Sequence, residues 1–408
     1  MMADDIATSV ANGELNLLDG RIYVDAPWSI YAHLRNEAPC YWDATQKIWG
    51  VSRYEDIVAI EKNAELYSSA SGSRPRIQSG DSMINKDDPR HQSQRRLVAR
   101  QFTPRAVKQL EDEIRLHVTK LIDKVAPQGH CEVVNDLAAP LPANIISAKL
   151  GFPEEHWEGC KKVSEVTMHE AGQYPLDGSD RPLDGESTEQ ILWFAEACIE
   201  LMELRRDDPQ DDLISTWVHA EINGEPLSDD EIVHEALLVL DGGAETTRTV
   251  IGAICYELIR HPDQRRILQD DLNILGETGV EEFIRWVSPI LNMRRTVTSD
   301  HEMHSKQIRE GDEILLMYGS ANRDERVFPD PDIFDVRREH NNHVAFGFGT
   351  HFCLGASLAR IELRVMFEEL LRRIPDMRLA EGAPEPQILP AVFTRAYDSI
   401  EVEFTPVG

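Results

Sequence analysis

One stretch of helical periodicity, residues 228–260, limits the architectures open to this chain more than any other feature. Ser228 and Glu231 form a capping box at its start, and His261-Pro262 supplies a stop signal at its end. About 33 residues rising 1.5 Å each extend roughly 50 Å. We therefore predict one long helix that crosses the molecule, with the other elements packed around it.

The middle of this helix carries a sequence that should weaken it, Gly242-Gly243-Ala244-Glu245-Thr246-Thr247. Two adjacent glycines cost about 1 kcal/mol each relative to alanine in a helix interior. Tight packing against a neighbouring helix would explain them, and so would a ligand that lies close to the bare backbone. Because an acid and a hydroxyl, Glu245 and Thr246, follow directly and offer a proton path, the second explanation is favoured.

A second unusual stretch, residues 346–355 (FGFGTHFCLG), places three phenylalanines and three glycines around one cysteine. It precedes a run with helical periodicity, residues 356–373. Backbone N–H groups in the loop and at the helix start favour a thiolate at Cys353, the form of cysteine that binds metals. Taken alone, a cysteine in an apolar loop is more often a small buried hydrophobic residue.

The charge of the chain argues against several classes of partner. Lys and Arg number 42 against 72 Asp and Glu, a formal net charge of −30, which disfavours nucleic acid and anionic membrane surfaces. No apolar run approaches the roughly 18 residues of a membrane span, and the N-terminus lacks the features of a signal peptide, so no membrane anchor is expected. The six cysteines are scattered without C-x-x-C pairs, which favours a cytoplasmic location over a disulfide framework.

The domain organisation follows from the absence of a Gly/Ser/Pro-rich linker in the 408 residues. Helical patterns dominate, and strand patterns occur at residues 48–52 and within 308–320. We predict a mainly α protein with small β-sheets, organised as an N-terminal extension (residues 1–27) and one domain (residues 28–408). A hairpin is expected near residues 390–394.

Five positions of the cysteine stretch, Phe346, Gly349, His351, Cys353 and Gly355, match the pattern F-x-x-G-x-[H/R]-x-C-x-G. This stretch resembles the haem-binding loop of the cytochrome P-450 superfamily. An H-x-x-x-R pair, the G-G-A-E-T-T sequence and an E-x-x-R pair precede it in the order that the superfamily has. The resemblance implies that superfamily's single-domain, trigonal-prism fold, with the long central helix over haem b.

The resemblance also implies which residues hold the haem. Cys353 would be the thiolate ligand of the iron. Basic side chains would bind the propionates, while glycines and a phenylalanine would contact the porphyrin; the matching positions are His91, Arg95, Gly242, Arg295, Phe346, His351 and Gly355. Arg294 competes with Arg295, because spacing does not choose between neighbours.

The implied reaction is monooxygenation, in which one oxygen atom of O2 enters a C–H bond. By the same resemblance, Thr246 would donate a hydrogen bond during oxygen activation, and Glu245 would relay protons from solvent. A peroxygenase of this fold uses hydrogen peroxide directly, but by resemblance it lacks this acid and threonine. A haem-based binding or sensor protein, which needs no proton relay, is the alternative outside enzymes.

The E-x-x-R pair, Glu282 and Arg285, lies three residues apart on one predicted helical face. Such pairs are usually exposed and contribute little, but the resemblance implies a buried pair that supports the cysteine loop. Relatives often place a third partner, an arginine, where this chain has Ile333. We expect Arg337 or Arg338 to substitute for it.

The substrate pocket is expected to be lined mainly by apolar residues: Val239, Leu240, Gly243, Ile290, Leu291, Met293 and Phe393. A lipophilic substrate follows from this, and the loop Ser68–Lys86 would cover it. Residues 72–75 (GSRP) and 292–293, with the cysteine loop, resemble actinobacterial steroid side-chain hydroxylases, which oxidise a terminal methyl group. Terpenoids, fatty acids and aromatic compounds are the alternatives.

Electrons would have to come from outside, because no flavin or iron–sulfur segment is fused to the chain. The resemblance implies NAD(P)H, a ferredoxin reductase and a ferredoxin as the source. An acidic ferredoxin would dock on basic residues expected near the cysteine loop: Arg95, Arg96, Arg100, Arg105, Arg360 and Arg364.

Overall fold

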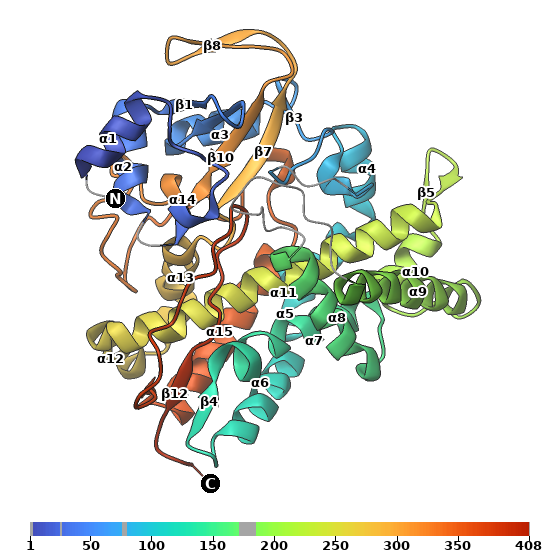
Figure 1. The fold of residues 1–408 in the computed structure, drawn as a ribbon. Coiled ribbons are helices and arrows are strands. Elements are labelled where there is room, and N and C mark those ends of the chain that lie inside the picture. Colours follow the sequence, from blue (N-terminus) through green and yellow to red (C-terminus); the bar gives the residue numbers. More distant parts are fainter. Residues whose placement is uncertain (1–2, 25–26, 76–79, 171–184, 408) are drawn as a thin grey trace.

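A computed structural model describes residues 3–24, 27–75, 80–170 and 185–407. As predicted, the chain is mainly α-helical with small sheets; α1, α2, α3 and α14 lie beside the larger sheet, and most of the other helices gather on the other side of the molecule (Figure 1). The helices are α1 Ala3–Ala11, α2 Trp28–Glu37, α3 Tyr54–Lys62, α4 Arg90–Val98, α5 Pro104–Lys108, α6 Glu111–Val125, α7 Pro140–Leu150, α8 Trp157–Glu165, α9 Gly185–Asp207, α10 Leu213–Val218, α11 Asp229–Arg260, α12 Pro262–Asp270, α13 Val280–Val287, α14 Tyr318–Ala321 and α15 Ala356–Arg373.

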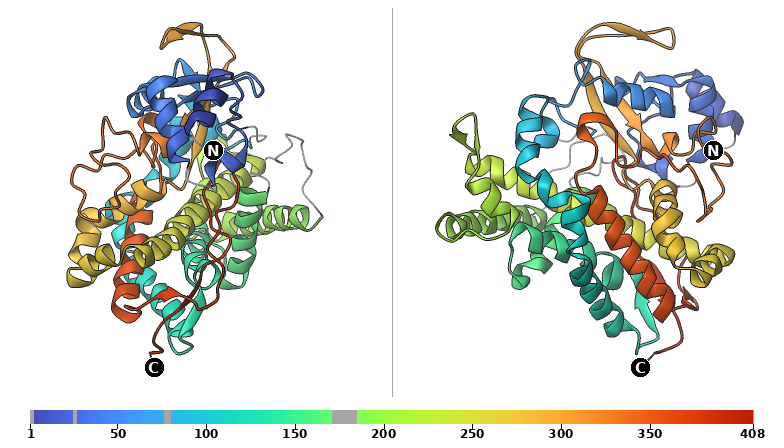
Figure 2. Two further views of the ribbon diagram at one scale, coloured as in Figure 1. Left: turned by 60° about the vertical axis from the view of Figure 1, so that its left-hand side comes forward. Right: turned by 180° about the vertical axis from the view of Figure 1, so that it is seen from behind.

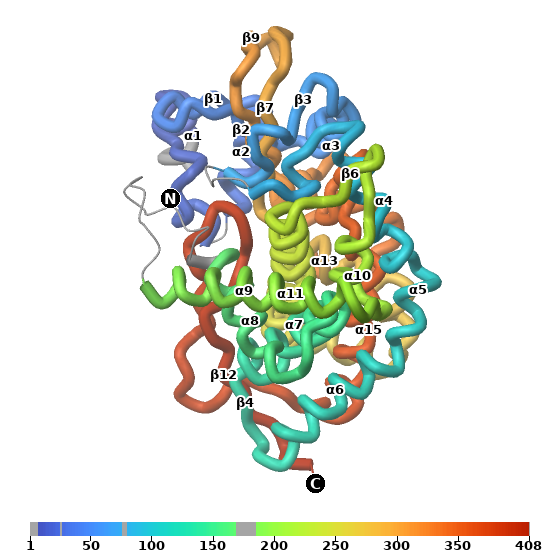
Figure 3. Tube along the Cα trace, turned by 90° about the vertical axis from the view of Figure 1, so that its right-hand side faces the viewer, coloured from blue at the N-terminus to red at the C-terminus, as the bar shows by residue number. Residues whose placement is uncertain are grey.

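The predicted long helix is α11, which runs for 32 residues and crosses the molecule (Figure 1). Figure 3 shows it foreshortened at the centre, with the other helices of that part around it. Its capping box is complete: the Glu231 N–H donates to Ser228 Oγ at 3.2 Å, and the Ser228 N–H donates to Glu231 Oε2 at 3.0 Å. The helix packs against α7, α8, α13 and α15. It therefore forms the axis around which the other helices are arranged.

The larger sheet has five strands in the order β1-β2-β10-β7-β3. Strand β10 pairs in parallel with β2 and antiparallel with β7, which brings the N-terminal part of the chain beside residues 292–317. The strands of this sheet are β1 Cys40–Asp43, β2 Ile48–Val51, β3 Tyr67–Ser68, β7 Asn292–Val297 and β10 Glu313–Met317. Both predicted strand regions are therefore present, the second one shorter than its pattern.

Three smaller sheets complete the described fold. The first has the order β11-β12-β4, and the other two are the hairpins β5-β6 and β8-β9. Their strands are β4 His130–Glu132, β5 Glu221–Ile222, β6 Glu225–Pro226, β8 His301–Met303, β9 Lys306–Ile308, β11 Arg378–Leu379 and β12 Glu401–Glu403. No strand covers the predicted hairpin near 390–394; isolated bridges at Ile290↔Thr394 and Ile388↔Tyr397 hold that segment instead.

The N-terminal segment packs onto the larger sheet, and the two ends of the chain lie far apart (Figure 2). Leu15, Leu17 and Leu18 are buried in one hydrophobic cluster with Leu315 and Met317 of β10. Burial of large apolar side chains is the main favourable contribution to folding. Residues preceding 28 therefore contribute to the core of the same unit.

The E-x-x-R pair of α13 is buried and bonds to residues of the segment 322–341, which precedes the cysteine loop. Arg285 Nε donates to Glu282 Oε2 at 2.7 Å, and neither side chain is exposed. Arg338 donates to the same oxygen at 3.1 Å. The structure thus selects Arg338 as the third partner, because its side chain is buried while Arg337 is exposed.

Candidate active site

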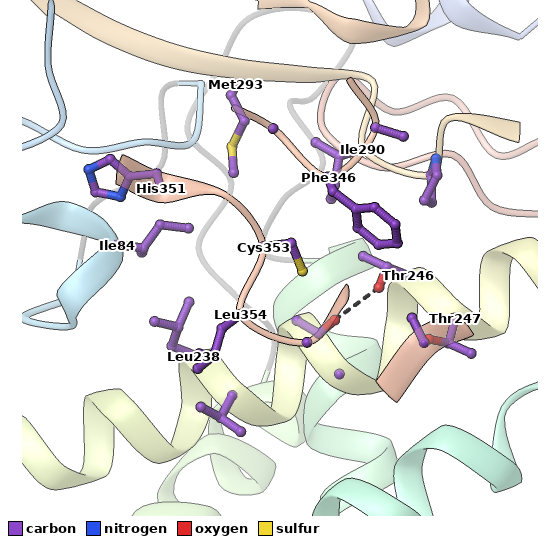
Figure 4. Close-up of a pocket in the computed structure, with 18 of the residues that line it drawn as sticks. Ile84, Leu238, Thr246, Thr247, Ile290, Met293, Phe346, His351, Cys353 and Leu354 are labelled. Carbon is purple, nitrogen blue, oxygen red and sulfur yellow. Dashed lines mark hydrogen bonds between the residues drawn. The ribbon is translucent and has the colours of Figure 1, made fainter. Parts of the chain in front are cut away.

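A cavity lies between α11 and the segment 346–355, here called the Cys loop (Figure 4). The sulfur of Cys353 points into it from the loop, and Thr246 and Thr247 face it from the helix. Most of the remaining lining is apolar, including Leu238, Ile290 and Leu354. The structure thus brings together two motifs that lie about a hundred residues apart in the sequence.

The Cys loop is shaped by glycines that other residues could not replace. Gly347 and Gly349 have φ angles of +70° and +69°, the left-handed region that glycine adopts without strain. A Cβ at Gly349 would lie 2.2 Å from the backbone oxygen of Glu61 on α3. The Cys353 N–H donates to the Phe346 carbonyl at 2.8 Å, which closes the loop. These constraints fix the direction of the Cys353 side chain.

Two opposing effects act on the Cys353 thiol. Burial raises its pKa, while hydrogen bonds from the backbone N–H groups of Gly355 and Ala356 and the charges of Arg95 and Arg360 lower it. The donors are those expected at the start of a helix, here α15. A bound metal cation deprotonates a coordinating thiol outright, so these donors are placed to stabilise a thiolate ligand.

The two glycines of α11 have different surroundings. A Cβ at Gly243 would lie 2.7 Å from Cγ1 of Ile146 on α7, so this glycine permits close helix packing. A Cβ at Gly242 would meet nothing within 4 Å, and the residue lines the cavity. The two explanations considered from the sequence therefore each apply to one glycine.

Thr246 and Glu245 lie on different sides of α11. Thr246 lines the cavity, and its Oγ1 donates to the Gly242 carbonyl at 2.9 Å (Figure 4). Glu245 is buried and is not among the residues that line the cavity. Its carboxylate pairs with Arg248 at 2.9 Å and accepts from Ser164 Oγ at 3.4 Å.

Four basic residues converge at one edge of the cavity: His91 and Arg95 of α4, Arg295 of β7 and His351 of the Cys loop. The rings of His91 and His351 have centroids 4.0 Å apart. Burial, followed by repulsion from His91, Arg295 and Arg95, lowers the pKa of His351 to about 2. Such a cluster in an apolar cavity suits an anionic ligand.

Arg294 faces away from the cavity and does not compete for this edge. Its guanidinium donates to the Gly72 carbonyl at 3.1 Å and pairs with Glu313 at 2.6 Å. Alternation along β7 places Arg295 on the opposite side of the strand, beside the cavity. The choice that spacing left open is thus made by the pleat of the strand.

Two buried carboxyl groups of the cavity lining were not singled out by the sequence analysis. Burial raises the pKa of Glu61 to about 7, although Arg295 and a hydrogen bond from Tyr318 act against this shift. Burial likewise raises the pKa of Glu362 on α15 to about 8, against a hydrogen bond from Thr247. Neither residue stands out in its helical pattern, because only the tertiary fold brings it to the cavity.

Most residues predicted for the pocket do line the cavity: Val239, Gly243, Ile290, Met293 and Phe393. So do the predicted haem contacts Gly242, Phe346 and Gly355. The positions predicted for Leu240 and Leu291 were wrong, because both are buried in hydrophobic clusters outside the lining. Each directly follows a lining residue, and one step along a helix or an extended segment turns the side chain elsewhere.

The sequence analysis named Arg74 only within residues 72–75 and Phe393 as a pocket residue, and it missed that Arg74 is joined to Asp241 and Thr167 at the cavity. We call this group the Arg74 cluster: Arg74, Thr167, Asp241 and Phe393. Arg74 and Phe393 line the cavity, and Asp241 connects Arg74 to Thr167. Asp241 directly precedes the glycine pair of α11. An acid among apolar residues of a helix, together with the arginine in residues 72–75, was the signal available in the sequence.

These residues fit a haem. One face of the cavity offers a sulfur ligand, one edge offers four basic side chains, and Gly242 leaves open space beside α11. A planar cofactor with an iron centre and two carboxylate groups matches this set of donors. Together, the fold and the site define a haem-thiolate protein.

Comparison with known proteins gives the same class. A family model for cytochrome P-450 matches residues 185–394. A steroid C26-monooxygenase of Mycolicibacterium smegmatis is 40% identical over 394 residues, which cover 96% of each chain. The chain therefore belongs to the cytochrome P-450 family of haem-thiolate monooxygenases.

Other relatives and solved structures agree. A methyl-branched lipid omega-hydroxylase of Mycobacterium bovis is 35% identical, covering 97% of this chain and 95% of the relative. The structure of a Mycobacterium marinum cytochrome P-450 in complex with pseudoionone superposes with a TM-score of 0.85 at 33% identity, covering 92% and 94% of the two chains. A Bacillus megaterium structure in complex with testosterone superposes with a TM-score of 0.83 at 31% identity, covering 93% of this chain and 98% of the other. None of the helices in the described ranges has the length and apolar character needed to cross a bilayer.

Proposed function

We propose that this enzyme hydroxylates a terminal carbon of a steroid or a branched lipid, with Cys353 as the ligand of its haem iron. The observation that carries this proposal is the position of the Cys353 sulfur opposite Thr246 across a mainly apolar cavity. The names of the relatives support the substrate class, since they include a steroid C26-monooxygenase and a methyl-branched lipid omega-hydroxylase.

The basic edge of the cavity would hold the cofactor. His91, Arg95, Arg295 and His351 would bind the haem propionates, which explains why two guanidinium groups and two imidazoles lie together in an apolar cavity. Bound in this way, the haem supplies oxygen activation and transfer of one oxygen atom to the substrate. Phe346 and Gly355 would pack against the porphyrin on the side of the thiolate.

Thr246 and Glu245 would deliver protons to the reacting oxygen. The Thr246 hydroxyl donates to the Gly242 carbonyl, so its oxygen keeps lone pairs that can accept a hydrogen bond from the cavity side; rotation of the hydroxyl would release its O–H to donate there. Glu245, held by Arg248 and Ser164 outside the cavity lining, would pass protons from solvent to this hydroxyl. The apolar lining keeps other water away from the reaction.

Electrons would arrive from a ferredoxin that is reduced by a NAD(P)H-dependent reductase. The Cys loop exposes Phe348 and Phe352, which offer apolar contacts for a docked partner. Of the basic residues expected nearby, Arg360 pairs with Glu281, and Arg364 pairs with Glu111. The positive potential of this face is therefore partly neutralised, and docking should weaken only moderately as salt rises. The cytoplasmic location stays a prediction.

Two spectra test the proposal. Reduced protein with carbon monoxide should give the red-shifted Soret band of a thiolate-ligated haem. Titration of the ferric protein with cholest-4-en-3-one should shift the Soret band toward high spin as the substrate displaces water. A carbonyl band typical of a histidine-ligated haem would refute the ligand assignment. Carbonyl binding without turnover by any ferredoxin system would favour a haem-based binding or sensor protein.

A further inference from the structure

The Arg74 cluster places a hydrogen-bond donor in a cavity that is otherwise mainly apolar. Arg74 Nη2 donates to Asp241 Oδ2 at 3.0 Å, and Asp241 Oδ1 accepts from Thr167 Oγ1 at 2.6 Å. The Arg74 guanidinium also lies over the ring of Phe393, 4.9 Å from its centroid. Three segments and the C-terminal region thus meet at one charged side chain.

The backbone that carries Arg74 is fixed to the sheet. The carbonyl of Ser73 accepts from the Arg294 N–H at 2.7 Å, and the carbonyl of Gly72 accepts from Arg294 Nε at 3.1 Å. Ser73 Oγ donates to Asn85 Oδ1 at 2.9 Å. Because both neighbours on its N-terminal side are held in this way, Arg74 enters the cavity from a defined position.

Arg74 retains hydrogen-bonding capacity toward the cavity. A guanidinium has five N–H donors. Within the described residues, its contacts are the one to Asp241 and a long one, 3.5 Å, to the Thr167 carbonyl. The side chain lines the cavity and is 22% exposed. A donor in this position lowers the cost of burying a polar atom of a ligand, which an apolar wall cannot do.

The charge of the cluster decides what kind of acceptor it suits. Asp241 is 2% exposed and already balances the charge of Arg74. A substrate carboxylate would place a second negative charge beside Asp241, in surroundings that screen it poorly. A ketone oxygen adds no charge and can accept the remaining N–H groups. The cluster therefore favours a neutral oxygen acceptor.

We propose that Arg74, held by Asp241, is a specificity-determining residue that binds a neutral carbonyl oxygen of the substrate. This inference rests on the proposed function and names the polar group of its substrate. Asp241 precedes Thr246 by five residues, about 7.5 Å along the helix. The substrate carbonyl would thus be held more than one helical turn from Thr246. The carbon that is hydroxylated would therefore be a different part of the substrate from the carbonyl.

Binding to the ferric holoenzyme tests this inference without measuring turnover. The probes are cholest-4-en-3-one, cholest-4-ene, which lacks the ketone, and phytanic acid, a methyl-branched carboxylic acid. Dissociation constants come from the Soret shift at pH 7.5. Wild-type protein should bind the ketone about tenfold more tightly than cholest-4-ene, the effect of one hydrogen bond from a charged donor.

Two variants separate the roles of the pair. Arg74→Met should bind the ketone and cholest-4-ene about equally, with an affinity for cholest-4-ene within twofold of wild type. Asp241→Asn keeps Arg74 but removes the balancing charge, so affinity for phytanic acid should rise about fivefold or more. Arg309→Met, which alters an exposed pair with Asp300, is the control and should change none of the constants.

Loss of folding in Arg74→Met would not hide the answer. The double variant Arg74→Met with Asp241→Asn leaves no buried charge in the cluster, and it should show the same loss of ketone preference. Thermal melting identifies variants that fold. If a folded variant without Arg74 keeps the wild-type preference for the ketone, or if wild-type protein binds both steroids equally, the inference is wrong and the proposed function stands.

Binding of phytanic acid but of neither steroid by wild-type protein would remove steroids from the proposed function and leave branched lipids as its substrate class. It would also refute the neutral-acceptor inference, since a carboxylate would then be the preferred polar group. Weak binding of phytanic acid that tightens in Asp241→Asn, together with a ketone preference in wild type, is the pattern that supports both.

Discussion

The Cys loop and the Arg74 cluster bound the same cavity but are built differently. The Cys loop is ten consecutive residues, with its shape set by glycines at positive φ and by a backbone hydrogen bond between Cys353 and Phe346. The Arg74 cluster draws single side chains from the loop after β3, the π-helix Val166–Glu170 after α8, helix α11 and the C-terminal region. The proposed iron ligand is therefore positioned by its sequence neighbours, whereas the proposed substrate-binding group is assembled from distant segments.

Removal of the sulfur tests the local half of this comparison and should have the largest effect. Cys353→Ala should abolish both the thiolate-type carbonyl spectrum and product formation, because no other cysteine lines the cavity. The measurements are the reduced carbon monoxide difference spectrum and product analysis. Cys255→Ala, a substitution within the core, is the control and should keep the spectrum. A thiolate-type band in Cys353→Ala would show that another ligand had been overlooked.

The buried network of Glu282, Arg285 and Arg338 should give the next largest effect. Glu282→Gln leaves Arg285 and Arg338 without their shared counter-charge in a fully buried site. Breaking such a pair costs about 3–5 kcal/mol in the free energy of unfolding, which urea denaturation measures. Asp300→Asn, which breaks an exposed pair with Arg309, is the control and should cost little. Equal losses of unfolding free energy in the two variants would mean that the buried network contributes no more to stability than the exposed pair does.

A pH-dependent test addresses the loop that carries Arg74. Glu235 on α11 accepts from the Met83 N–H at 2.6 Å, and burial raises the pKa of this carboxyl to about 8. Between pH 4.5 and 8 the carboxyl is ionised in the unfolded state but still protonated in the folded state. The free energy of unfolding therefore falls as the pH rises through this window, and above pH 8 the loss is complete. Glu235→Gln stays neutral, so it should lie within about 1 kcal/mol of wild type at pH 5 and exceed it by roughly 5 kcal/mol at pH 9.

Thermal melting at several pH values measures this difference. Glu231→Gln is the control in which stability should depend on pH in the opposite direction. In the wild type, the Glu231 carboxyl pairs with Arg90 and has a lowered pKa. The variant should be less stable than wild type at pH 7 and approach wild type as pH falls below about 4.5. A constant difference between Glu235→Gln and wild type from pH 5 to pH 9 would argue against burial of a titrating acid.

Thr246→Ala tests proton delivery from the helix that faces the Cys loop. The product formed per NAD(P)H should fall roughly tenfold as electrons go to hydrogen peroxide, while haem binding stays intact. Oxygen uptake, peroxide and product are measured together. Thr246→Ser keeps the hydroxyl and should restore most of the yield. An unchanged yield in Thr246→Ala would remove Thr246 from the proton path.

The adjacent glycines of α11 provide the smallest and most closely matched test. Gly243→Ala places a methyl group against Ile146 and should cost about 1 kcal/mol after the gain in helix propensity. Gly242→Ala meets open space and should stabilise the haem-free protein by up to about 1 kcal/mol, but weaken haem retention. Urea denaturation and haem transfer to apomyoglobin measure the two effects. Identical behaviour of the variants would mean that both glycines serve packing alone.

Much of the fold and of the candidate site could be predicted from the sequence. The capping box and the stop signal gave both ends of α11, and the glycine spacing around Cys353 gave the loop, because these features depend on neighbours within one or two turns. The errors at Leu240 and Leu291 arose one residue from correct positions, since a pattern gives the element more reliably than the direction of each side chain.

The sequence by itself determined the class of protein and the identity of the proposed iron ligand, because both are written in short contiguous motifs. Only the tertiary structure decided that Arg295 rather than Arg294 faces the cavity and that Arg338 completes the buried network. It alone also placed Arg74 beside Asp241, 167 positions away. The physical reason is that contacts at such separations are set by how helices and sheet pack against each other, and no local pattern records that packing.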